Sequence, residues 1–219
     1  VQTDAAEPSG VALITVDAKG ENCIAVASGA SGALMPEDIE AVTGLIAQAD
    51  CVLLQLETPL ETVRRAAELA VGLGVPVILN PAPACELPAD LYDCLEVITP
   101  NESEAELLTG VKVSDEASAL RAAQALCERG VLQVVITMGA QGAYVYDGSD
   151  GVLVPAPKVE AVDTTAAGDV FNGALAVALE DEVPLEEAVR FAVKAAAISV
   201  TRLGAQASAP YRKEVSGRA

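Results

Sequence analysis

The sequence predicts an α/β fold in which a mostly parallel sheet is covered by helices on both faces. From residue 36 onward, strand-like apolar runs alternate with helix-like segments, as in chains that build parallel sheets. Aromatic residues make up only 3% of the chain and Trp is absent, so the core must be built from Ala, Val, Leu and Ile. Small aliphatic residues suit strands that are buried on both faces. The 219 residues suffice for one large domain with its own core.

The N-terminal region departs from this alternation. Residues 11–16 and 23–27 are short β-type runs on either side of a turn around Gly20, which predicts a hairpin, and a glycine-rich loop follows. We therefore expect a hairpin and hinge in residues 1–34 and an α/β core in residues 35–219.

The core should contain six helices and six strands. The helix-like segments begin or end at Pro or Gly and are residues 36–48, 60–73, 101–108, 115–129, 168–179 and 185–202. The strand-like segments are short apolar runs and are residues 51–56, 76–79, 96–98, 131–137, 143–147 and 151–155. The last three strands follow one another without a helix, which predicts an antiparallel edge. Ligands of such sheets bind at the carboxyl ends of the parallel strands.

Composition excludes several classes of function. The net charge of −19 argues against nucleic acid or an acidic membrane as a partner. The absence of His excludes histidine acid–base chemistry, Ser-His triads and His-ligated metals. The five cysteines are scattered without a C-x-x-C pair, which predicts reduced thiols in a cytoplasmic protein without a zinc site. We find no signal peptide and no apolar run of transmembrane length.

The motif Asp-Thr-Thr-Ala-Ala-Gly-Asp at residues 163–169 carries the strongest chemical signal. The small residues Ala166, Ala167 and Gly168 would let an anion approach the free backbone N–H groups where a helix begins. Asp169 would lie in the first helical turn, where its carboxylate could accept a proton from a hydroxyl that attacks a phosphate. Alternatively, Asp169 only stabilises the helix N-terminus.

Two other segments lie at strand ends. One combines two glycines that permit either a nucleotide's close approach or a plain hairpin turn, and it comprises Thr137, Met138, Gly139, Ala140, Gln141 and Gly142. In the other, Asn101 and Glu104 either form a capping box or line a site for a hydrated Mg²⁺ and phosphate.

Two weaker signals complete the set. Glu57 follows a buried strand, so it is either a ligand-contacting acid at the sheet rim or a solvated loop residue. The segment 201–208 ends a helix, and its carbonyl oxygens near Ser208 could hold a monovalent cation together with Asp163. An ordinary glycine C-cap at Gly204 is the alternative interpretation.

Together these segments resemble the ribokinase (PfkB-type) carbohydrate kinases over nearly the whole chain. The D-T-x-A-A-G-D motif is specific to this family, and residues 80–84, 99–105 and 204–206 look like its ribokinase branch. The resemblance implies a three-layer αβα sandwich. It also implies that residues 1–34 are a partial β lid with a hinge and that residues 35–219 are a nucleotide-binding kinase core.

The resemblance implies ATP-dependent phosphorylation of D-ribose to D-ribose 5-phosphate, with Mg²⁺ and an activating K⁺. Asp169 would be the catalytic base, next to an anion hole of Ala166, Ala167 and Gly168, and Glu57 would contact the sugar with Asp169. The nucleotide would meet Asn101, Thr137, Met138, Gly139, Ala140, Gln141, Gly142 and Gly168. Glu104 would hold Mg²⁺ through water, and K⁺ would bind at Asp163, Thr165, Ser199, Arg202, Gly204 and Ser208.

Related readings stay open. They are a kinase for deoxyribose, fructose or adenosine, and an inactive nucleotide-binding fragment. A Rossmann dehydrogenase is not indicated, because no G-x-G-x-x-G follows a first strand.

The sequence departs from the family in two ways. The family's N-terminal part, which supplies opening strands, part of the lid and sugar contacts, is missing, so we expect only one lid hairpin. Ser31 stands where ribokinases typically have Asn. Homodimers that form through the lid are a further expectation from the family.

Overall fold

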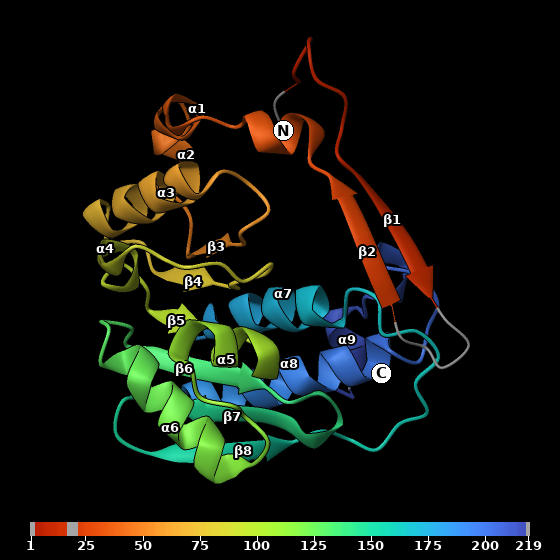
Figure 1. The fold of residues 1–219 in the computed structure, drawn as a ribbon. Helices are drawn as coiled ribbons and strands as arrows, with labels where there is room; N and C mark the ends of the chain where they lie inside the picture. Colours follow the sequence, from red (N-terminus) through yellow and green to blue (C-terminus); the bar gives the residue numbers. More distant parts are fainter. Residues whose placement is uncertain (1–2, 17–21, 218–219) are drawn as a thin grey trace.

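The computed structural model describes residues 3–16 and 22–217 as an α/β sandwich with a separate hairpin. A six-stranded sheet lies between helices, and a two-stranded antiparallel sheet stands beside it (Figure 1). The three-layer architecture predicted from the sequence is confirmed.

The central sheet follows chain order from one edge to the other. Its strands are β3 (Val52–Leu54), β4 (Val77–Leu79), β5 (Val97–Ile98), β6 (Gln133–Thr137), β7 (Gly142–Tyr146) and β8 (Gly151–Pro155). The strands β3 to β6 are parallel, whereas β6, β7 and β8 pair antiparallel. The antiparallel edge is therefore where the sequence predicted it.

Two hydrophobic layers form, one on each face of the sheet. One face is covered by α3 (Leu60–Gly72), α4 (Ala89–Tyr92), α5 (Glu102–Thr109) and α6 (Glu116–Cys127). The other is covered by α7 (Ala167–Leu179) and α8 (Leu185–Ser199). Within β4, Val77 and Leu79 pack into the first layer and Ile78 into the second, because successive side chains of a strand point to opposite faces.

Some helix boundaries differ from the prediction. The helix expected at residues 36–48 is two short helices, α1 (Pro36–Glu40) and α2 (Thr43–Ile46). The Thr43 hydroxyl donates to the Glu40 carbonyl at 2.7 Å, and this local bond competes with a continuous helix. The helix expected to reach residue 202 ends at Ser199. The sequence analysis missed α4 and α9 (Arg212–Val215), which are each too short to show a helical period.

The hairpin pairs β1 (Val11–Val16) with β2 (Asn22–Ala27), and its predicted turn around Gly20 lies outside the described residues. It stands away from the sheet on the side where α7 begins (Figure 1). At its base, Gly29 has φ +51°, and a Cβ there would meet the Pro8 carbonyl oxygen at 2.2 Å, so only glycine fits. Helix η1 (Gly29–Ala33) starts at this close contact. No helix within the described ranges combines the length and apolarity that crossing a membrane requires.

Candidate active site

The loop before α7 forms a turn with an unusual backbone. Ala166 is the N-cap of α7 and has φ 58° and ψ 16°, which is the left-handed conformation. The Ala167 N–H donates to the Thr164 carbonyl at 3.2 Å, so one of the three predicted anion-hole amides already has a partner. A Cβ added to Gly168 would meet no atom within 4 Å, which leaves room in front of the helix start. The first amides of a helix lack intrahelical acceptors and carry partial positive charge.

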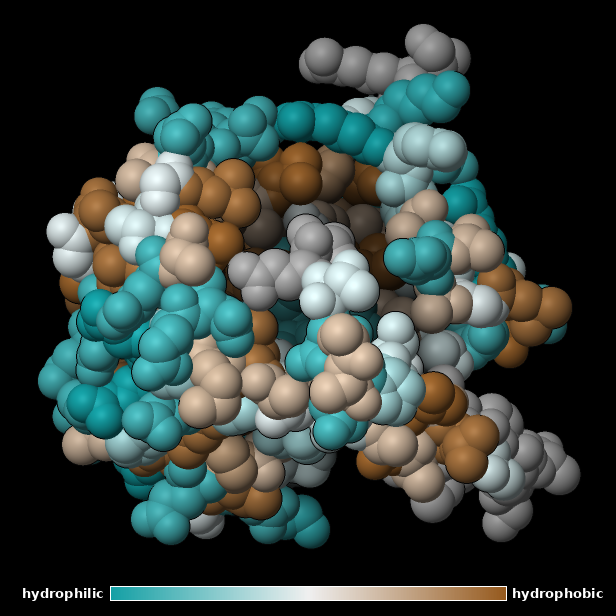
Figure 2. All heavy atoms as spheres, turned by 90° about the horizontal axis from the view of Figure 1, so that it is seen from above, coloured by the Kyte–Doolittle hydropathy of each residue, from teal (hydrophilic) through white to brown (hydrophobic). Residues whose placement is uncertain are grey.

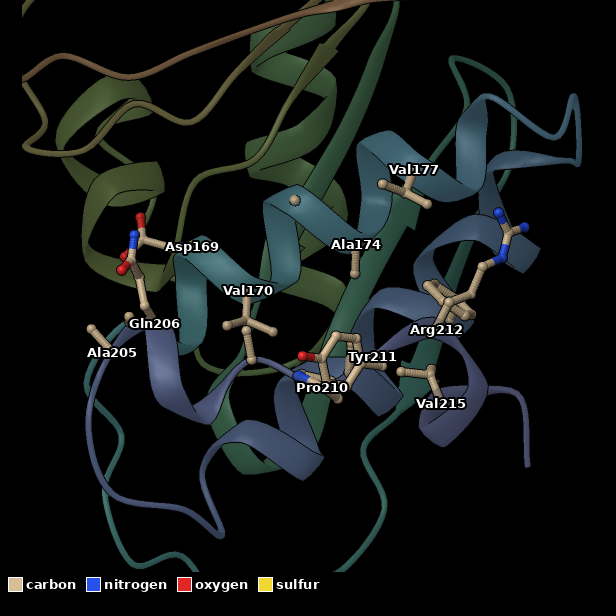
Figure 3. Close-up of a pocket in the computed structure, with 15 residues that line it drawn as sticks. Asp169, Val170, Ala174, Val177, Ala205, Gln206, Pro210, Tyr211, Arg212 and Val215 are labelled. Atoms are coloured by element: carbon tan, nitrogen blue, oxygen red, sulfur yellow. The ribbon is translucent and has the colours of Figure 1, made fainter. Parts of the chain in front are cut away.

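Asp169 is exposed in the first turn of α7 and lines a pocket of about 620 Å³. Figure 3 shows Asp169, Ala205 and Gln206 at one end of this pocket, with Val177 and Arg212 at the other. The carboxylate therefore lies at an open cleft, where it can meet a ligand.

Apolar side chains from three helices make most of the pocket wall. They include Val170 and Ala174 of α7, Phe191 of α8 and Val215 of α9. Apolar residues also line a hollow in the face seen from above in Figure 2. Among the predicted site residues, Ala166 and Asp169 lie on the pocket wall.

The Asp169 carboxylate has a side-chain partner that sequence analysis missed. The Gln55 side-chain nitrogen Nε2 donates to Asp169 Oδ1 at 2.8 Å, and Gln55 comes directly after β3. Asn80 and Thr99 follow β4 and β5 in the same way. A polar residue directly after a buried strand was the available signal, because the carboxyl ends of parallel strands meet at one edge of the sheet.

Asp163 is bound to its surroundings through backbone donors. The Thr165 N–H donates to Oδ1 and the Gly204 N–H to Oδ2, each at 2.9 Å. The Thr165 hydroxyl, the Gly204 N–H and the Thr165 N–H hold the pKa of the Asp163 carboxyl below its ordinary value. The Asp163 N–H donates to the Val200 carbonyl at 3.1 Å, so the loop is fastened to the end of α8.

Three other predicted cation residues, Ser199, Arg202 and Ser208, lie at or beyond the end of α8. The Arg202 N–H donates to the Ser199 carbonyl at 2.9 Å, and the Arg202 guanidinium lies 3.5 Å from the Ser208 carbonyl oxygen. These oxygens and the Asp163 carboxylate are the hard donors that suit a monovalent cation. Over the part of the chain that is described, no three His, Cys, Asp or Glu side chains gather as a metal site, so such a cation would depend on carbonyl oxygens.

Asn101 and Glu104 form the capping box that the sequence offered as one interpretation. Asn101 Oδ1 accepts from the Glu104 N–H at 2.9 Å, and Glu104 Oε2 accepts from the Asn101 N–H at 2.8 Å. Burial raises the pKa of the Glu104 carboxyl, while the hydrogen bond from the Asn101 N–H opposes this shift. The Thr137 N–H donates to the Pro100 carbonyl at 2.9 Å, so the two segments predicted to bind nucleotide lie side by side.

The two glycines of the segment 137–142 have different surroundings. A Cβ on Gly142, which has φ +113°, would meet the Val154 carbonyl oxygen at 2.0 Å, so the close approach of β8 requires this glycine. Gly139 has φ +52° and faces open space, as do its exposed neighbours Ala140 and Gln141 in helix η2 (Gly139–Gln141). Met138 is buried. The open side of the turn is therefore at residues 139–141.

Glu57 is exposed in the loop that joins β3 to α3, two residues beyond Gln55. It thus lies at the same end of the sheet as Asp169, since Gln55 contacts that carboxylate.

Comparison with known proteins gives a consistent result. The pfkB family of carbohydrate kinases matches residues 1–212. A ribokinase of Haemophilus influenzae is 47% identical over 98% of this chain and 70% of its own length. A deoxyribokinase of Salmonella typhi is 40% identical over 92% of this chain and 66% of its own length.

A solved structure is also similar across the chain. The structure of Arabidopsis thaliana ribokinase complexed with ribose and ATP aligns with a TM-score of 0.88 at 32% identity, over 97% of this chain and 70% of that one. The family match, the sequence identities and this alignment agree with the fold described above. The chain therefore belongs to the pfkB family of carbohydrate kinases, enzymes that transfer a phosphoryl group to an alcohol.

Proposed function

We propose that the protein transfers the γ-phosphoryl group of ATP to the terminal hydroxyl of D-ribose, giving D-ribose 5-phosphate and ADP. The observation that carries the proposal is the exposed Asp169 carboxylate, which lies in the first turn of α7 at an open pocket. A carboxylate beside an amide-lined helix start would repel a phosphate that merely binds there. A carboxylate at this position is instead suited to remove a proton from a hydroxyl that attacks the phosphate.

The Asp169 carboxylate and the N–H groups before it act in the same transfer step. The Asp169 carboxylate accepts the hydroxyl proton as the sugar oxygen forms its bond to the γ-phosphorus. The bond between that phosphorus and the bridging oxygen breaks, and ADP leaves with the electron pair. The N–H groups of Ala166, Ala167 and Gly168 stabilise the charge on the phosphoryl oxygens during transfer. For Ala167, this requires an N–H now 3.2 Å from the Thr164 carbonyl to turn toward the phosphoryl group.

The remaining predicted residues supply binding. The nucleotide phosphates lie near Asn101 and the open side of the turn at residues 137–142, with Gly168, and Glu57 contacts the sugar from the loop after β3. The hydrogen bond between Thr137 and Pro100 supports this assignment, because it joins the two nucleotide segments.

Two ions fit the oxygen atoms at these positions. Glu104 would hold a hydrated Mg²⁺, which neutralises phosphate charge when bound. Asp163, with Thr165 and the carbonyls of Ser199, Arg202, Gly204 and Ser208, would hold K⁺, which orders the loop before α7. The hydrogen bonds of Asp163 to Thr165 and Gly204 support this site, because they already gather its parts.

Deoxyribose is the second candidate substrate, and it is favoured by the 40% identity to a deoxyribokinase.

The exposed apolar residues of the hairpin support a homodimer that forms through this lid. Val11, Leu13 and Val26 are 56%, 69% and 58% exposed, and a partner hairpin would bury them.

The test is ADP formation by the purified protein with ATP, Mg²⁺ and K⁺, with and without each sugar. We expect turnover that depends on ribose, a weaker response to deoxyribose, and a lower rate when Na⁺ replaces K⁺. ATP binding without sugar-dependent ADP formation would contradict the proposal and indicate a nucleotide-binding module. Fructose and adenosine serve as comparison substrates.

A further inference from the structure

A chain of polar side chains links Asp169 to the ends of three parallel strands. Gln55 Nε2 donates to Asp169 Oδ1 at 2.8 Å and also to Asn80 Oδ1 at 3.2 Å. Asn80 Nδ2 donates to the Thr99 carbonyl at 3.1 Å, and the Thr99 hydroxyl donates to Asn172 Oδ1 at 2.6 Å. Asn172 Nδ2 then donates to the Gly168 carbonyl at 2.9 Å. The chain of bonds thus returns to the residue next to Asp169, and we call these five residues, with Gly168, the polar ring.

The polar ring is built into the core. Asn80, Thr99 and Asn172 are only 7%, 1% and 3% exposed, and each is hydrogen-bonded. Buried polar groups without hydrogen-bond partners are costly. Few arrangements of the ring other than the observed one would therefore satisfy all of its buried members. Asp169 is exposed and lines the pocket, whereas Gln55 is half-buried and joins Asp169 to the buried members of the ring.

The direction of every bond in the ring follows from two backbone carbonyls, those of Thr99 and Gly168. The Gly168 carbonyl accepts from Asn172 Nδ2, which leaves Asn172 Oδ1 to accept from the Thr99 hydroxyl. A carbonyl can only accept, so Asn80 must turn its NH₂ group to the Thr99 carbonyl and its Oδ1 to Gln55. Gln55 must then present its NH₂ group, whose two hydrogens go to Asn80 and Asp169. A flipped Gln55 amide would set its oxygen against two acceptors. The ring therefore always offers a donor to Asp169 Oδ1.

We propose that Gln55 is a positioning residue that holds the Asp169 carboxylate by Oδ1 and leaves Oδ2 to take the proton from the sugar hydroxyl. This inference rests on the proposed kinase function. Asp169 is exposed and would otherwise sample several rotamers at the pocket. Gln55 acts through Asp169, and the buried part of the ring fixes Gln55.

Two substitutions at Gln55 test the proposal. Gln55→Met keeps the length of the side chain and removes the donor, so kcat should fall about 10- to 100-fold through misorientation, while KM for ATP stays within roughly two-fold. Gln55→Glu replaces the donor with a carboxylate that repels Asp169, and kcat should fall further at neutral pH. As the pH is lowered, the introduced carboxyl becomes protonated and donates again, so the ratio of variant to wild-type kcat should rise.

Gln48→Glu is the matched control. Gln48 is exposed after α2, and its Nε2 donates to the nearby Gly44 carbonyl, so the same chemical change there should leave kcat and its pH profile unchanged. A pH-dependent ratio in this control would show that the Gln55→Glu profile reports surface charge, and it would overturn the proposal.

The outcomes separate this inference from the proposed function. Wild-type protein without sugar-dependent turnover would contradict the kinase function, whereas an active wild type matched by Gln55→Met would overturn the role of Gln55 alone. A crystal structure of Gln55→Met gives a readout that needs no activity. The Asp169 carboxylate should leave its present rotamer, and an unmoved carboxylate would contradict the inference.

Discussion

Asp163 and Asp169 lie at the two ends of one short motif, but the protein holds them in different ways. Asp163 accepts from the backbone N–H groups of Thr165 and Gly204, and the Thr165 hydroxyl together with these two donors lowers the pKa of its carboxyl. Asp169 accepts from the side-chain amide of Gln55 and is exposed at a pocket. The first carboxylate ties two loops together, whereas the second lies at the pocket, where we propose that it keeps Oδ2 open to the sugar hydroxyl.

Glu104 is a third carboxylate whose surroundings can be compared with those of Asp163 and Asp169. Its carboxylate also serves the backbone, through the capping box with Asn101, yet burial raises its pKa. Asp163 and Glu104 should therefore affect stability with opposite pH dependence. The three carboxylates thus differ in what holds them, and their loss should change different properties of the protein.

The largest effect should come from Asp169→Asn. Loss of the proposed general base should lower kcat by about 10²- to 10⁴-fold, since this is the usual contribution of such a group. The melting temperature and ATP affinity should stay close to wild type, because the Asn oxygen can still accept from Gln55. Steady-state kinetics, calorimetric titration with ATP and thermal unfolding measure these quantities.

The control for this variant is Asp150→Asn, in the exposed turn between β7 and β8. It makes the same chemical change away from the pocket and should leave kcat unchanged. Normal turnover by Asp169→Asn would break the comparison, because the open carboxylate would then have no chemical role.

Asp163→Asn should lower both the stability and kcat, and the loss of kcat should be smaller than that of Asp169→Asn. The folded state lowers the pKa of Asp163, so its carboxylate contributes stability that is present above the ordinary Asp pKa and is lost as pH falls through the lowered value. The wild type should therefore melt higher than the variant at neutral pH, and the difference should close in acid. Thermal unfolding over a pH series measures this gap. A gap that stays constant with pH would mean that the charge of Asp163 does not tie the loops.

Glu104→Gln should have only a small effect on stability. Gln also forms capping boxes, so the free energy of unfolding should change by less than about 1 kcal/mol. Because the folded state raises the pKa of Glu104, its stabilising contribution is present at acid pH and is lost as pH rises through the raised value. The variant should thus gain stability relative to wild type as pH rises, opposite to Asp163→Asn, and should need more Mg²⁺ for half-maximal turnover. Equal Mg²⁺ requirements would leave Glu104 with the capping role alone.

Local signals predicted much of the fold. The alternation of helices and strands placed the parallel sheet, and the run of strands in residues 131–155 placed its antiparallel edge. The capping box of Asn101 and Glu104 was readable because its two partners lie three residues apart. The break between α1 and α2 was not predicted from the sequence, and the Thr43 hydroxyl bond to the Glu40 carbonyl lies at this break.

The sequence revealed the candidate site only in part, because its parts meet across long separations. Asp169 could be found within its own motif, but Gln55 is 114 residues away, and their contact depends on which strands become neighbours. The link from Asp163 to Gly204 likewise depends on where α8 ends. The apolar pocket combines three helices, one of which is too short to recognise in the sequence.

The left-handed backbone of Ala166 has a consequence for binding. A residue with a Cβ raises the energy of the chain by about 1–2 kcal/mol in this conformation, so the surrounding contacts must hold it there. Apart from the Ala167 N–H, which bonds to the Thr164 carbonyl, a turn held in this way has few alternative shapes to give up when an anion binds, and association loses less conformational entropy. The free energy that shapes the turn is thus supplied once, when the chain folds, and not again in each catalytic cycle.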